Sequence, residues 1–372
     1  MLRIIALKIS NWWRLVSDLS LSHQAELTYT GPSKQSVSTR ILNTHQAGDI
    51  SMPPRSNSLL TTMAERNRRS RSNRNLLAIL FGCFVLPFSV QAQSSDRPNV
   101  VLILADDLGY TDISPFGSEI STPNISRLAD QGLSFTNYHT AANCAPARAM
   151  LLTGVDSHRN GVPNIPESIP PEQMAYDHYQ GVLSDKVVTI ASLLQDNGYH
   201  TYMTGKWHLG HTPSLLPSAR GFDRTIAMAD AGADNWEQRI FLPIYDQANW
   251  YADGEPHTLP DDFYSSEYFI DKAIEFIDSN ESSDQPFFAY IPFQAVHTPV
   301  QAPKEYSDRY AGVYDKGWSV MREKRRQAAI AKGVIPADSQ VKVTPGTPDW
   351  NESTDEQKRY DARRMEVYAG MV

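Results

Sequence analysis

A continuous apolar run near residue 100 limits the possible fold most strongly. The residues from Val100 to Ala105 are all apolar, and the acidic pair Asp106 and Asp107 follows them directly. A short apolar run without alternation is typical of a strand that is buried on both faces of a sheet. Helices that alternate with parallel strands cover both faces in this way. The run therefore predicts an α/β fold with two carboxylates at the end of a central strand.

The residues around this run alternate between helical and extended patterns. Helices are expected at residues 122–132, 145–153, 186–197, 269–277 and 355–372, and strands at 133–140, 199–204 and 287–292. This alternation predicts an α/β sandwich with a mainly parallel central sheet. Such sheets bind ligands at the carboxyl ends of their strands, so functional residues are expected just after each strand.

An apolar run at residues 76–90 has the layout of a secretory signal peptide. A basic stretch precedes this run, and a small-residue site that ends at Ala92 follows it. The run is also short for a membrane span. We therefore predict a signal peptide at residues 63–92, a periplasmic or secreted protein, and no stable membrane insertion after cleavage. The alternatives are a lipoprotein signal with Cys83 as the lipidated residue, and a buried apolar strand.

The first 62 residues precede this predicted signal. They carry no sustained periodicity and are rich in Ser, Thr, Gln and Asn. Because signal peptides begin at the N-terminus of a chain, we interpret residues 1–62 as an upstream extension from a misplaced start codon, with translation beginning at Met63. An unstructured leader is the alternative. Residues 93–372 then form the body of the protein.

Charge is distributed unevenly between these parts. Residues 1–92 hold eleven Lys and Arg against four acids, a net charge of +7, so the formal net charge of -8 leaves -15 for residues 93–372. A body this acidic is repelled by nucleic acid and by anionic membranes. Nucleic acid is therefore not an expected partner, and an anionic substrate group would need a local cluster of cations.

The sequence Cys-Ala-Pro-Ala-Arg at residues 144–148 carries the strongest chemical signal, and Leu-Leu-Thr-Gly follows it at 151–154. Cys144 is the one cysteine that remains after the predicted signal cleavage, so the mature chain has no internal disulfide. The motif resembles the signature of type I, formylglycine-dependent sulfatases of the alkaline-phosphatase superfamily. The similarity runs from about Pro98 to the end of the chain and is greatest to bacterial arylsulfatases. A buried structural thiol is the alternative interpretation of Cys144.

This resemblance implies an alkaline-phosphatase-like sandwich that hydrolyses a small sulfate ester to an alcohol and sulfate. In that family a formylglycine-generating enzyme oxidises the cysteine to formylglycine, and the hydrate of the aldehyde attacks sulfur with one hydroxyl. The second hydroxyl then collapses to the aldehyde and expels sulfate. Cys144 is thus the expected nucleophile, and its place before a helix favours an anion there. Arg148, one helical turn further on, is expected to hold the diol.

Two further motifs supply the remaining expected catalytic residues. Gly-Lys-Trp-His-Leu-Gly at residues 205–210 matches the family, and the resemblance implies that Lys206 binds the sulfate and His208 contacts and deprotonates the diol. His297 precedes a Thr-Pro pair, and the family credits a histidine here with protonating the leaving alcohol. The alternatives are a solvated loop for 205–210 and a capping role for His297.

The acidic pair Asp106 and Asp107 is expected to bind a metal ion. Adjacent carboxylates repel each other unless a cation lies between them, and oxygen ligands suit calcium or magnesium. The resemblance implies one Ca²⁺ bound by Asp106, Asp107 and the modified Cys144. The family completes this site with an Asp-Asn pair followed by Gly, adds a second sulfate-binding Lys, and has a smaller C-terminal domain. No such pair follows His297, and the resemblance implies that the pair and the second Lys lie beyond residue 372. We therefore expect residues 93–372 to be a catalytic domain that is incomplete at its C-terminus and lacks the smaller domain.

Two other functions remain open at this point. A tetrahedral anion beside a metal ion also suits a phosphate or phosphonate ester hydrolase of the same superfamily. A chain with half of a site would be an inactive fragment. The natural substrate is not indicated by any motif.

Overall fold

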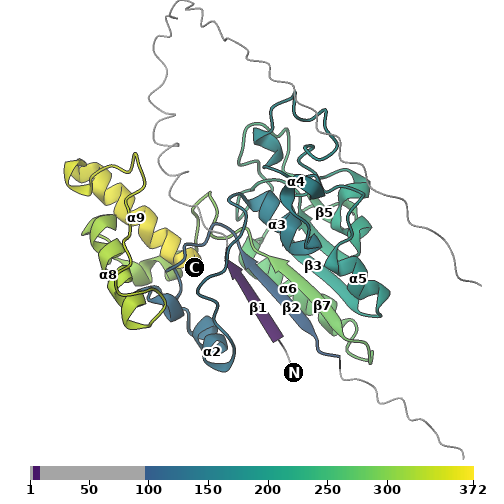
Figure 1. The fold of residues 1–372 in the computed structure, drawn as a ribbon, viewed down its shortest axis with the longest axis horizontal. Coiled ribbons are helices and arrows are strands. Elements are labelled where there is room, and N and C mark those ends of the chain that lie inside the picture. Colours follow the sequence, from purple (N-terminus) through teal and green to yellow (C-terminus); the bar gives the residue numbers. More distant parts are fainter. Residues whose placement is uncertain (1–2, 9–96) are drawn as a thin grey trace, which may run out of the picture. The chain divides into compact units, whose positions relative to one another are not determined.

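The computed structural model describes residues 3–8 and 97–372 (Figure 1). The predicted signal peptide at 63–92, Cys83 and the start at Met63 lie outside the described residues. Arg3–Lys8 forms the strand β1, which the lack of periodicity in residues 1–62 did not indicate. The rest of that segment is likewise outside the described part of the chain.

The described strands form one sheet in the order β1-β2-β7-β3-β4-β5-β6. Their bounds are Arg3–Lys8, Val100–Ala105, Phe287–Pro292, His200–Lys206, Arg224–Met228, Trp250–Ala252 and Glu255–Pro256, in that order. The pairings from β1 to β4 are parallel, and β5 and β6 join in antiparallel orientation. The prediction of a mainly parallel central sheet is confirmed, and β2 lies inside it as its apolar run indicates.

Helices cover both faces of this sheet. The α-helices are α2 Pro123–Gln131, α3 Cys144–Thr153, α4 Ser157–Asn160, α5 Ile190–Asp196, α6 Ser265–Asp278, α7 Lys304–Ser307, α8 Gly317–Ala331 and α9 Asp355–Met371. Short 3₁₀ helices lie at Ser114–Phe116, Pro166–Ser168, Pro213–Leu215, Pro217–Arg220, Asp308–Tyr310 and Trp350–Glu352.

Side chains of β2 alternate between the two faces of the sheet, and each face packs against its own hydrophobic cluster. Leu102 packs with the buried residues of α3 and α5 on one face of the sheet. Val101, the preceding residue, packs with Ala273 and Phe276 of α6 on the other face. Successive side chains of a strand point to opposite faces, so an all-apolar strand needs a helix layer on each side. The expected α/β sandwich is therefore confirmed.

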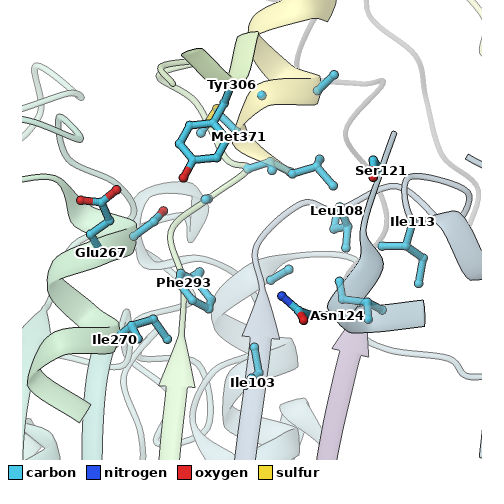
Figure 2. Close-up of a pocket in the computed structure, with 18 of the residues that line it drawn as sticks. Ile103, Leu108, Ile113, Ser121, Asn124, Glu267, Ile270, Phe293, Tyr306 and Met371 are labelled. Carbon is cyan, nitrogen blue, oxygen red and sulfur yellow. The ribbon is translucent and has the colours of Figure 1, made fainter. Parts of the chain in front are cut away.

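The helices α8 and α9 pack around a third cluster that includes Ile120, Met321, Trp350 and Tyr368. A cavity of about 710 Å³ lies between α2, α6, the end of β2 and the end of α9, and Figure 2 shows its lining, with Ile103, Phe293 and Met371 among the labelled residues. None of the predicted site residues lines this cavity.

One predicted strand is wrong and two helix bounds shift. Residues 133–140 are irregular, and Leu133 and Phe135 are 86% and 68% exposed. Their apolar alternation has no partner strand within the described sheet, and without pairing an extended segment is not a strand. The helix expected from residue 186 starts at Ile190, because the Thr189 side chain accepts a hydrogen bond from the amide of Ser192 and caps it there. Helix α6 begins earlier than the expected 269–277.

Within residues 3–8 and 97–372, none of the helices combines the length and the apolar character needed to cross a bilayer.

Candidate active site

The predicted site residues meet at one edge of the sheet. In the sheet order, β7 lies between β2 and β3, so the carboxyl ends of these three parallel strands are neighbours. Asp106 follows β2, and Lys206 ends β3. The loop after β7 is tied to this edge because Asp106 donates its amide to the carbonyl of Ala295, and Val296 donates to the carbonyl of Asp106. Strand ends thus gather residues that are far apart in the sequence.

Asp106 lies between two cations in the interior. Its Oδ2 is 2.5 Å from Lys206 Nζ and its Oδ1 is 3.0 Å from Arg148 Nη2, and all three side chains are fully buried. Burial alone would raise the pKa of Asp106, but the charges of Lys206 and Arg148 hold that pKa well below its usual range. Arg148 also donates from Nη1 to the carbonyl of Lys206, 2.7 Å away. The cluster therefore holds two fixed cations and one ionised carboxylate.

Cys144 is the first residue of α3, and its thiol faces His208. The Sγ atom is 3.3 Å from His208 Nδ1, and the thiol is free and buried. Burial alone would raise the pKa of the thiol, but the positive charges of Lys206 and His208 lower it. The amides of the first helical turn and the positive end of the helix dipole also favour an anion here. Position 144 is therefore a place where negative charge is stabilised.

His297 lies on the other side of the acidic pair. Its Nε2 is 3.7 Å from Asp107 Oδ2, and its Nδ1 donates to the carbonyl of Thr298, 2.5 Å away. Burial, together with the charge of Lys206, lowers the pKa of His297 to about 4. The ring of Phe241 lies edge-on to the imidazole, with the centroids 6.4 Å apart. The hydrogen bond to Thr298 leaves Nε2 as the ring nitrogen that faces the acidic pair.

Three backbone features shape this edge of the sheet. Asp107 and His208 have φ angles of 57° and 55°, in the left-handed region that residues with a side chain rarely adopt. Such conformations persist where the surrounding structure holds them, and they are concentrated at functional sites. Gly205 has a φ of 142°, and a Cβ there would lie 2.0 Å from the carbonyl oxygen of Pro292. The glycine that opens the second motif is thus required by the close approach of β3 and β7.

Asp107 is the carboxylate of the pair whose pKa is raised. Burial, followed by the charge of Asp106, raises its pKa to about 7. The charges of Lys206 and Arg148 lower this pKa only in part, because both cations form their ion pairs with Asp106. Among the residues that the structure describes, no group of three or more His, Cys, Asp or Glu is arranged to hold a metal ion. Asp106 and Asp107, the two carboxylates that the sequence predicts as metal ligands, are adjacent in the chain, and the unmodified thiol of Cys144 offers sulfur rather than oxygen.

Two further residues at the site were not indicated by the sequence. Glu167 accepts a hydrogen bond from His208 Nε2 at 3.2 Å, and Tyr245 donates its hydroxyl to the same carboxylate. Both belong to segments without a recognisable motif, so only the contact of Glu167 with His208 and that of Tyr245 with Glu167 mark them. Two other histidines near the motifs, His139 and His158, form hydrogen bonds outside the cluster. His139 contacts Asn137, His158 contacts Tyr179, and both are exposed.

The fold is an α/β sandwich, and a buried cluster of charged side chains lies at the carboxyl ends of its central strands. The family model for sulfatases matches residues 98–372. The chain therefore belongs to the sulfatase family, and the resemblance noted from the Cys144 motif is confirmed.

Known relatives and structures agree with this assignment. The chain is 42% identical over 304 residues to an uncharacterised sulfatase of Schizosaccharomyces pombe, with 77% of this chain and 54% of the relative covered. It is 38% identical over 290 residues to an arylsulfatase of Klebsiella aerogenes, with 77% and 62% covered. The crystal structure of Ps i-CgsB has a TM-score of 0.50 at 27% identity, covering 73% of this chain and 56% of that chain. The chain thus spans less than two thirds of the length of these relatives.

Proposed function

We propose that the protein is a sulfuric ester hydrolase of the arylsulfatase type, which cleaves small sulfate esters to an alcohol and sulfate. The observation that carries this proposal is the buried cluster in which Lys206 and Arg148 surround Asp106 close to Cys144 at the start of α3. Two cations exceed the single carboxylate between them, so positive charge remains for a sulfate group. The arylsulfatase relative from Klebsiella supports the same substrate class.

The proposed catalytic roles are those that the family resemblance implies, and the contact of His208 with position 144 supports them. Formylglycine formed from Cys144 would supply, as its hydrate, one hydroxyl for attack on sulfur and a second for release of sulfate. Lys206 binds the sulfate and offsets its charge, and Arg148 holds the diol. His208 presents Nδ1 toward position 144 and accepts a proton from the hydroxyl there. His297, whose Nε2 points to the acidic pair, is assigned to protonate the leaving alcohol. Because the pKa of His297 is lowered to about 4, this role requires that the bound sulfate anion raises that pKa.

We further propose that one Ca²⁺ is held by Asp106, Asp107 and the modified residue 144. The raised pKa of Asp107 supports this assignment, because a buried carboxylate beside another carboxylate needs a counter-charge. Calcium would supply that charge and polarise the sulfate oxygens. Oxygen rather than sulfur is required of the third ligand, so the ligand set depends on conversion of Cys144 to formylglycine.

A maturation partner and a location belong to this proposal. A formylglycine-generating enzyme has to oxidise Cys144, and the signal at residues 63–92 would direct the chain to the periplasm or to secretion. N-terminal sequencing of the exported protein should give Gln93 as the first residue. Recovery of residues from 1–62 in the mature protein would contradict the expected start at Met63.

Parallel assays with an aryl sulfate and an aryl phosphate test the function. The full chain is expressed with and without a formylglycine-generating enzyme, and the peptide that contains Cys144 is examined by mass spectrometry. We expect phenol release from the sulfate only after co-expression, and none from a Cys144→Ala variant with an unchanged circular dichroism spectrum. Faster turnover of the phosphate would favour a phosphate or phosphonate ester hydrolase. A fully modified protein that hydrolyses neither ester would be an inactive fragment.

A further inference from the structure

A carboxylate lies behind His208, on the side of the ring that faces away from Cys144. The His208 Nε2 atom is 3.2 Å and 3.3 Å from the two carboxylate oxygens of Glu167, whereas Nδ1 is 3.3 Å from Cys144 Sγ. The side chains of His208 and Glu167 are only 2% and 12% exposed. The imidazole therefore bridges position 144 and a nearly buried carboxylate, with one ring nitrogen on each.

Tyr245 fixes this carboxylate from a separate loop. Its hydroxyl donates to Glu167 Oε1 and accepts a hydrogen bond from the amide of Ala231, 3.3 Å away. Because the Ala231 amide occupies the acceptor side of the hydroxyl, the tyrosine proton is directed at Glu167. Burial alone would raise the pKa of Glu167, but the hydrogen bonds that it accepts from His208 and Tyr245 lower it. Glu167 is thus a fixed, ionised acceptor.

The backbone of His208 makes such a support necessary. Its φ of 55° lies outside the extended conformation of β3, which ends at Lys206. The ring orientation is therefore set by side-chain partners and not by the regular alternation of a strand. An ionised carboxylate accepts only, so it requires a proton on the facing nitrogen of the ring. A carboxylate that orients a catalytic imidazole and selects its tautomer is a general device in enzymes.

We propose that Glu167, aligned by Tyr245, is a positioning residue that keeps a proton on His208 Nε2 and so presents Nδ1 as the proton acceptor toward position 144. This inference rests on the proposed sulfatase function for its kinetic consequence, but the hydrogen bond itself is testable without activity. Glu172 provides a matched control, because it lies five residues further along the same loop and is exposed.

Nuclear magnetic resonance of the full chain labelled with ¹⁵N-histidine tests the hydrogen bond directly. The proton on His208 Nε2 should give a slowly exchanging, downfield resonance, which is assigned by its loss in a His208→Gln variant. We expect the resonance to persist in Glu172→Gln and to disappear in Glu167→Ala. Persistence of the resonance in Glu167→Ala would overturn the inference, whether or not the protein hydrolyses sulfate esters.

Kinetics of the formylglycine-containing protein separate positioning from simple packing. Glu167→Gln has the same shape as the native residue but its amide also donates, so it no longer selects the Nε2 proton. We expect kcat to fall about 10- to 100-fold in both Glu167→Ala and Glu167→Gln, with little change in KM. Tyr245→Phe should cause a smaller loss. Full kcat in Glu167→Gln would show that Glu167 only fills space. If the wild-type protein has no sulfatase activity while the resonance behaves as expected, the proposed function fails and the positioning role stands.

Discussion

The buried pairing of Asp106 with Lys206 and Arg148 predicts a large and measurable dependence of stability on one carboxylate. An Asp106→Asn substitution keeps the shape of the side chain but removes its charge. Lys206 and Arg148, both fully buried, would then have lost the anion that lies 2.5 Å and 3.0 Å from them. Removing one partner of a buried ion pair costs about 3–5 kcal/mol, because the remaining charge stays desolvated and unpaired.

The measurement is the free energy of unfolding in urea with a chelator present, so that metal binding does not contribute. The matched control is Asp177→Asn, because Asp177 and Lys186 form a pair of similar length, 3.0 Å, with side chains 72% and 62% exposed. That variant should unfold like the wild type, since solvent screens an exposed pair. A double variant, Asp106→Asn with Lys206→Met, should recover part of the lost stability by removing one of the unpaired cations. An Asp106→Asn protein as stable as the wild type would refute the reasoning that this cluster is a desolvated ion network.

Three further outcomes are expected. Gly205→Ala should lower the melting temperature strongly, because the added Cβ would lie 2.0 Å from a backbone oxygen. Gly154→Ala is the control, because Gly154 has a φ of 66° and a Cβ there would meet no atom within 4 Å. That variant should lose only about 1–2 kcal/mol of stability to backbone strain. Burial alone would raise the pKa of Glu119, but Arg325 lowers that pKa below the ordinary 4.5. The ionised Glu119 side chain therefore stabilises the folded protein above pH 4.5, and this stabilisation is lost as the pH falls through the pKa of the folded state. A Glu119→Gln variant should therefore show a flatter fall of melting temperature with acid. Calcium should raise the melting temperature of the formylglycine-containing protein and not that of its Asp107→Asn variant, as followed by differential scanning fluorimetry.

Local patterns in the sequence predicted the three adjacent strands β2, β7 and β3 and the main motifs, but not the strands β1, β4, β5 and β6. The apolar runs at Val100–Ala105 and Phe287–Pro292 are strands with the expected bounds, and α9 ends one residue before the expected 355–372. These elements are predictable because the pattern of apolar residues within a short segment indicates a buried strand or an amphipathic helix. The family could also be recognised from the sequence, because the Cys144 motif combines a rare residue type with a fixed spacing of Pro and Arg.

The failures have the opposite cause. Residues 133–140 carry strand-like alternation, but whether an extended segment becomes a strand depends on a partner elsewhere in the chain, and the described sheet provides none. The start of α5 was missed by four residues because a side-chain hydrogen bond from Thr189, and not periodicity, sets it.

Only the tertiary structure decided how the site residues are paired. The sequence placed Asp106, Lys206 and Arg148 near strand and helix ends, but the distances show that Asp106 takes both cations and that Asp107 is left with a raised pKa. The tertiary structure also places Glu167 next to His208, which is 41 residues away in the sequence, and Tyr245 next to Glu167, which is 78 residues away. Such contacts arise from the packing of loops over the sheet, and no spacing within one segment records them. The physical reason is that local periodicity encodes which face is buried, whereas the identity of a buried charge's partner is fixed only when distant segments meet.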